Sequence, residues 1–72
     1  MTDRQANLDL FSSQLQETGV VNTSFLPNQE VELASQLLVA ARQIGASTVR
    51  IVVNFERAGT GRITCLIDGA TA

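Results

Sequence analysis

The segment 48-TVRIVVNFERAGTGRITCLIDG-69 decides the predicted fold, because it contains two alternating runs joined by a glycine-containing turn. Apolar residues occupy the odd positions of both runs, which is the period-two pattern of half-buried strands. These positions are Val49, Ile51, Val53 and Phe55 in the first run and Ile63, Cys65 and Ile67 in the second. The segment therefore predicts an antiparallel β-hairpin over about residues 48–69.

Charged residues at the even positions predict the register of this hairpin. With the turn centred on Gly59, Glu56 lies opposite Arg62. The same centre places Arg50 opposite Asp68. Cross-strand pairs of opposite charge stabilise antiparallel strands. We therefore expect the hairpin to be centred on Gly59.

Two other registers compete with this one. A slip by one residue would expose the apolar row of one strand to water, so only slips by two residues are real competitors. A turn centred on Ala58 would place Arg50 opposite Leu66, and one centred on Thr60 would place a valine opposite an aspartate. Both competitors lose the charge pairs, so the sequence favours the Gly59 centre.

Two helices are predicted before the hairpin. The first spans about residues 3–18 and carries a thin apolar stripe of three side chains. The second spans about residues 28–44, and Gly45 follows its wide apolar stripe. The segment Val20–Pro27 between them is rich in Asn, Thr and Ser but also apolar. We expect it to be a connection that lies against the core.

These elements give the order helix, helix, strand, strand (ααββ), which is an α+β fold. A chain of 72 residues is expected to form one small domain over residues 1–72. A two-stranded sheet has two open edges, and a core this small gains from a partner chain. We therefore expect a homodimer in which two hairpins join edge to edge into a four-stranded antiparallel sheet.

The composition argues against catalysis. The chain has no His, Lys, Trp or Tyr, and its five basic residues are all arginine. It therefore lacks the commonest general base and metal ligand, and it has no lysine for a Schiff base or a phosphate-binding loop. Cys65 lies on the apolar row, where a buried thiol is inert. We expect no enzyme activity, no catalytic residues, no metal site and no cofactor.

Sequence features also bear on location. No hydrophobic stretch approaches the roughly 18 residues of a membrane span. No basic segment followed by an apolar run begins the sequence, and a lone cysteine cannot form an intrachain disulfide. We expect a cytoplasmic protein that does not bind a membrane.

Candidate binding residues concentrate in the hairpin. Its tip carries two arginines, two glycines and a threonine, whose backbone N–H groups and hydroxyl could approach an anion. It is not a P-loop, because the lysine and the following helix are missing. On the polar face of the hairpin, a valine and a leucine form a small apolar spot. The candidate partner-binding residues are Arg50, Val52, Arg57, Thr60, Arg62 and Leu66.

Binding is the predicted function of such a chain. We expect a small adaptor or modulator that acts as a homodimer on another protein. The alternative is weak binding of nucleic acid or an anionic ligand through the tip, which the net charge of −2 and the lack of exposed aromatic residues disfavour. A solvated turn and a scattered apolar surface pair would explain the same residues without any partner.

Overall fold

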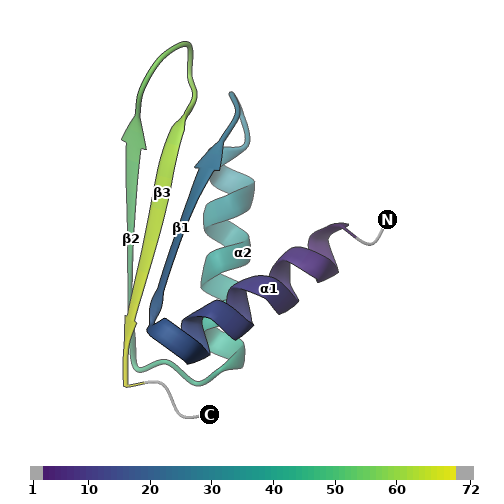
Figure 1. Cartoon of the computed structure of the whole chain (residues 1–72), viewed down its shortest axis with the longest axis vertical. Helices are drawn as coiled ribbons and strands as arrows, with labels where there is room; N and C mark the ends of the chain where they lie inside the picture. The colour runs from purple at the N-terminus through teal and green to yellow at the C-terminus, as the bar shows by residue number, and fades with distance from the viewer. Residues whose placement is uncertain (1–2, 70–72) are drawn as a thin grey trace.

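The computed structural model of the chain describes residues 3–69, which form two helices and one three-stranded antiparallel sheet (Figure 1). In chain order the elements are α1 (Asp3–Thr18), β1 (Val20–Phe25), α2 (Glu30–Gln43), β2 (Thr48–Phe55) and β3 (Gly61–Asp68). The predicted α+β class is confirmed. The predicted order ααββ is wrong, because a strand separates the two helices. In the part of the chain that the structure describes, neither helix is long and apolar enough to cross a membrane.

The additional strand, β1, occupies most of the segment Val20–Pro27, so the prediction of a connection there is wrong. β1 pairs with β3, and its odd-numbered residues Val21 and Phe25 are buried. Asn22 and Ser24 point to the other face of the sheet, whereas Thr23 lies on the same face as Val21 and Phe25 and is partly buried. A strand of six residues with this little apolar content gives a weak periodic signal. It becomes a strand because β3 supplies the hydrogen-bonding partner.

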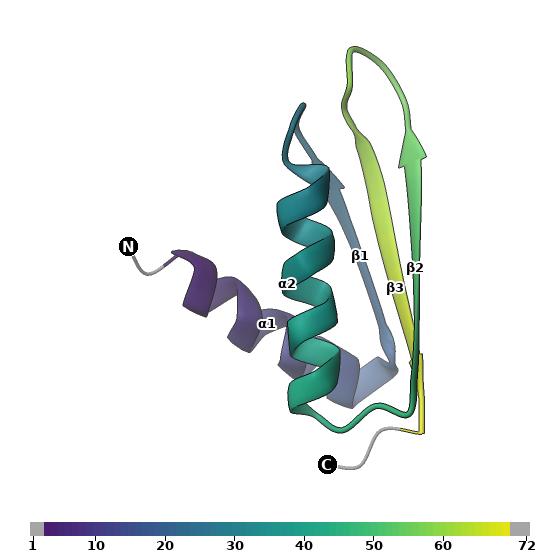
Figure 2. The same ribbon diagram turned by 180° about the vertical axis from the view of Figure 1, so that it is seen from behind.

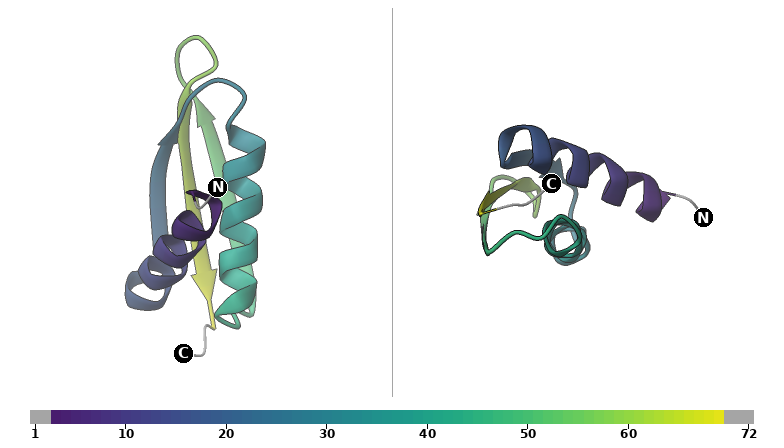
Figure 3. Two further views of the ribbon diagram at one scale, coloured as in Figure 1. Left: turned by 90° about the vertical axis from the view of Figure 1, so that its right-hand side faces the viewer. Right: turned by 90° about the horizontal axis from the view of Figure 1, so that it is seen from below.

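The middle strand of the sheet is β3, and the strand order is β1-β3-β2. β3 is antiparallel to both neighbours, so β1 and β2 run in the same direction. α2 connects these two parallel strands and forms a split β-α-β unit. Figure 2 shows that this crossover is right-handed, as such connections almost always are. Both helices lie on one side of the sheet (Figure 3).

The core lies between the helices and the odd-numbered face of the sheet. α1 contacts α2 and β1, while α2 contacts β3 and β2. On the helix-facing side, Ile63 and Cys65 of the middle strand β3 are fully covered, whereas Ile51 and Val53 on the edge strand β2 are only partly buried. The buried residues that form this core cluster are Phe11 and Leu15 of α1, Val21 and Phe25 of β1, Leu37, Ala40 and Ala41 of α2, Ile44 just after it, and Ile63 and Cys65 of β3.

The register of β2 against β3 differs by two residues from the predicted one. The structure has the Ala58 centre, with Arg50 opposite Leu66, so the prediction of a Gly59 centre is wrong. Neither predicted charge pair forms across the strands, and Arg62 lies opposite Asn54. The separation of odd from even positions is kept, so the two faces of β2 and β3 carry the predicted residues.

The turn accounts for part of this difference. Ala58 and Gly59 both have positive φ, 54° and 80°, as a type I′ turn requires, and the carbonyl of Arg57 accepts the N–H of Thr60 at 2.9 Å. The carbonyl of Thr60 also accepts the N–H of Glu56 at 2.8 Å, so two residues face one and form a β-bulge. Without the bulge, this two-residue turn would pair odd with even positions.

A contact among all three strands accounts for the rest of the difference between the predicted and the observed register. Gly61 lies opposite Phe25 on β1 and opposite Phe55 on β2. The two rings meet edge to face with centroids 5.7 Å apart and an interplanar angle of 85°. A Cβ on Gly61 would overlap the carbonyl of Asn54 and lie 2.8 Å from Phe25 Cζ. Glycine is therefore needed for the rings to meet across the middle strand.

We predict that Gly61→Ala lowers the free energy of unfolding by about 3 kcal/mol, at the upper end for overpacking, because the clash includes backbone that cannot move aside. Gly59→Ala is the control, since its Cβ would be 3.4 Å from Pro27 and its cost comes from positive φ, about 1 kcal/mol. Urea unfolding followed by circular dichroism measures both. Equal stability of Gly61→Ala and the wild type would show that this contact is wrong.

Candidate functional site

The face of the sheet turned away from the helices is called here the open face, and it consists of even-numbered side chains. Each row across the sheet takes one residue from each strand, in the order β1, β3, β2. The rows are Val20, Leu66 and Arg50; Asn22, Thr64 and Val52; and Ser24, Arg62 and Asn54. Because the helices cover the opposite side (Figure 3), these side chains face outwards.

The open face has an apolar centre. Val20, Val52 and Leu66 are 40%, 39% and 38% exposed. Leu66 lies directly opposite Val20, and Val52 is its diagonal neighbour on β2, facing Thr64. The predicted contact of Val52 directly opposite Leu66 is therefore wrong, although both belong to one patch. Sequence reasoning missed Val20, because β1 was not predicted. The available signal was the adjacent valines, which are strong strand formers.

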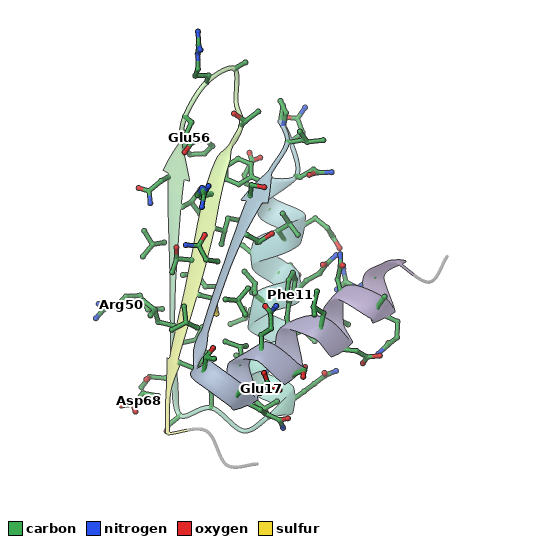
Figure 4. The ribbon with its side chains drawn as sticks, viewed as in Figure 1. Phe11, Glu17, Arg50, Glu56 and Asp68 are labelled. Carbon is green, nitrogen blue, oxygen red and sulfur yellow. The ribbon has the colours of Figure 1, made fainter. Side chains whose placement is uncertain are left out.

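The structure separates the six predicted site residues into two groups. Arg50, Val52, Arg62 and Leu66 share the open face, whereas Arg57 and Thr60 lie in the turn beyond the strands. Figure 4 shows the side chains of Arg50 and Asp68 directed away from the helices, with Phe11 in the interior between the helices and the sheet.

The arginines of the open face have no carboxylate partner within the described residues. Within residues 3–69 the one ion pair joins Arg4 of α1 to Glu32 of α2, and neither residue belongs to the open face. Arg50 is opposite Leu66, and Arg62 is opposite Asn54 and Ser24. The guanidinium groups can therefore donate hydrogen bonds to carboxylates of another molecule without first breaking an internal ion pair.

The tip of the turn is less suited to an anion than its sequence indicates. The hydroxyl of Thr60 donates to the carbonyl of Arg57 at 2.6 Å, and the N–H of Thr60 donates to the same carbonyl. Both donors that Thr60 would offer to an anion are thus occupied. Arg57 remains exposed at the tip, but neither donor of Thr60 is free to bind an anion beside it.

Cys65 is fully buried in the middle strand, and burial raises the pKa of its thiol, because the thiolate would lose its hydration. A buried, protonated thiol is a poor nucleophile. The geometry therefore gives Cys65 a packing role beneath the open face.

Comparison with protein-family models, with curated proteins and with solved structures finds no match to this chain.

We predict a pH dependence of stability that arises from Cys65. Folding raises the pKa of the Cys65 thiol. The contribution of this thiol to the free energy of unfolding is therefore fully present below the unfolded thiol pKa of about 8.5, and it is lost as the pH rises above that value. The chain has no lysine or tyrosine, so no other side chain titrates between about pH 8 and pH 11. The free energy of unfolding should fall across this range in the wild type and stay flatter in Cys65→Ala. Equal slopes in urea titrations would contradict this prediction.

Proposed function

We propose that this chain is a non-catalytic adaptor that binds another protein through the open face and acts as a homodimer. The observation that carries the proposal is the apolar centre of that face, surrounded by polar and charged side chains. Interfaces between proteins commonly combine an apolar core with a polar rim. Three paired strands fix the backbone beneath these side chains, so no backbone segment of this face has to become ordered on binding.

The charges of the open face indicate the chemistry of the partner. Arg50 and Arg62 lie on either side of the row that contains Val52, and Asp68 lies at one end of the same face. A protein surface with an apolar centre and carboxylates beside it complements this pattern. Such rim charges steer the encounter and contribute more to specificity and association rate than to affinity.

A protein partner is favoured over a single-stranded nucleic acid by the position of the aromatic residues. Phe11 and Phe25 are buried in the core, and Phe55 lies on the helix side of β2. Stacking platforms for bases need aromatic side chains on the binding surface. The open face has arginines but no aromatic residue among the described positions.

The proposed homodimer addresses the size of the surface. A typical stable interface buries about 800 Å² on each partner. Three exposed apolar side chains on one copy supply a small part of that area. Two copies would present two such centres, and simultaneous contact with both would raise the overall affinity.

We predict that Val52→Thr with Leu66→Thr weakens capture of the partner while the fold is kept, because threonine suits a strand but removes apolar surface. Leu10→Gln is the control, since Leu10 is an exposed apolar residue of α1, 51% exposed, outside the open face. Quantitative mass spectrometry after pull-down from native lysate compares the variants with the wild type, and circular dichroism checks their folding.

Proteins lost by the double variant but retained by Leu10→Gln would support the open face. Arg50→Gln with Arg62→Gln should weaken capture of the same proteins most strongly at low salt. Equal capture by both double variants would place the functional surface elsewhere. Capture that nuclease treatment abolishes would show nucleic acid as the ligand and would contradict the proposal.

A further inference from the structure

One edge of the sheet is formed by β2, and within residues 3–69 no strand pairs with its outer side. The N–H of Glu56 donates to the carbonyl of Thr60, so even positions on this side of the hairpin direct their backbone groups towards β3. By alternation, the odd positions direct their N–H and C=O groups outwards. These outward positions are Val49, Ile51, Val53 and Phe55.

The two edges of the sheet are protected to different degrees. β1 has six residues, and the hydroxyl of Thr18 donates to the carbonyl of Val20 at 3.0 Å and accepts its N–H at 3.3 Å. Neither strand contains proline or lysine, which usually prevent an edge strand from pairing with another chain. β2 is longer, with eight residues, and within residues 3–69 no side chain hydrogen-bonds to its backbone as Thr18 does to that of β1. β2 is therefore the edge that can accept a strand.

Apolar side chains of α2 lie beside this edge. Gln36 and Gln43 face α1, accepting hydrogen bonds from Asn7 and Ser12 at 3.2 and 3.5 Å. Val31 and Leu38, one above the other at seven-residue spacing, lie on the opposite flank of α2, 76% and 45% exposed.

Since α1 contacts β1 while α2 contacts β3 and β2, this flank of α2 lies on the β2 side of the sheet. Phe55 of β2 lies on the face of the sheet that the helices cover, and it is 64% exposed. The free backbone edge thus has an apolar strip beside it, formed by Val31, Leu38, Ile51, Val53 and Phe55.

We infer that β2 binds β2 of a second copy, antiparallel and about a two-fold axis, forming a continuous six-stranded sheet with all four helices on one face. This inference rests on the homodimer of the proposed function but not on its partner-binding face. Each strand added to a free edge satisfies the N–H and C=O groups of both strands. A two-fold axis lets one surface patch serve both copies.

The register follows from which backbone groups are free. Outward-directed odd positions must pair with odd positions, so the axis passes beside a residue and not between two. An axis beside Val52 pairs Val49 with Phe55 and Ile51 with Val53, and uses all four outward positions. An axis beside Ile51 would leave Phe55 beyond the overlap. The Val52 axis is therefore the register with most hydrogen bonds.

The charges on the open face agree with this register. With the axis beside Val52, Arg50 of one copy faces Asn54 of the other and is a diagonal neighbour of Glu56 of that copy. Neither Arg50 nor Glu56 has an ion-pair partner among the described residues. An axis beside Arg50 would instead set two arginines against each other. Charge complementarity thus supports a second copy of this chain as the occupant.

We predict that the wild type sediments with twice the mass of 7.7 kDa in a micromolar concentration series. Leu38→Glu should weaken the dimer about tenfold or more, because a two-fold interface loses each contact twice and gains two like charges. Leu10→Glu is the control on α1, at a leucine of similar exposure outside the strip, and it should leave the dimer unchanged. Analytical ultracentrifugation measures all three.

A second variant tests the backbone edge directly. Val53→Pro removes an outward N–H without touching the β2–β3 hydrogen bonds and should also weaken the dimer, whereas Asn54→Pro breaks the internal ladder and should unfold the chain. In a dimer of labelled and unlabelled copies, isotope-filtered nuclear Overhauser contacts should join Ile51 of one copy to Val53 of the other.

The possible failures are distinguishable. A wild-type monomer throughout the concentration series would overturn the β2 pairing together with the homodimer of the proposed function. A dimer of unchanged strength in Leu38→Glu, or intermolecular contacts through β1, would overturn the β2 pairing alone. Partner capture through the open face is tested separately, by the pull-down comparison of the open-face variants with Leu10→Gln.

Discussion

The pairing of β3 along both of its edges is the constraint on which the other features of this protein depend. Gly61 begins that strand between Phe25 and Phe55, and the two rings meet across it at 5.7 Å. A side chain at this position would overlap the backbone of β2. Because the contact includes all three strands, it ties their registers together. Those registers then determine which side chains share a row on the open face.

The energies involved explain why a charge-based register is wrong. Exposed ion pairs contribute about 0–1 kcal/mol, because water screens them and long side chains lose entropy. An aromatic pair contributes about 0.5–1.5 kcal/mol beyond the area it buries. The turn adds a geometric demand, since Ala58 and Gly59 both have positive φ. Packing and turn geometry therefore outweigh the pairing of Arg50 with Asp68 on an open surface.

The sheet has two faces and two edges, and the two proposals concern the open face and the outer edge of β2. The odd-numbered face is covered by α1 and α2 and forms the core. The open face carries apolar and basic side chains, which suit a protein with acidic groups around an apolar patch. The outer edge of β2 carries backbone donors and acceptors, which suit another strand. Pairing at that edge would leave both open faces on one side of a larger sheet, so the two surfaces are compatible.

The sequence by itself determined the α+β class and the separation of buried from exposed positions in β2 and β3, because periodicity is a local property of the chain. It also brought Arg50, Val52, Arg62 and Leu66 onto one face. Only the tertiary structure decided that Val20–Phe25 is a strand, that β3 is central and that Val20 completes the apolar patch. The reason is that β1 and β3 are some forty residues apart, and a short strand with polar alternate positions acquires its structure from a distant partner. The register was likewise decided by a contact among residues on three strands, which no single segment of sequence contains.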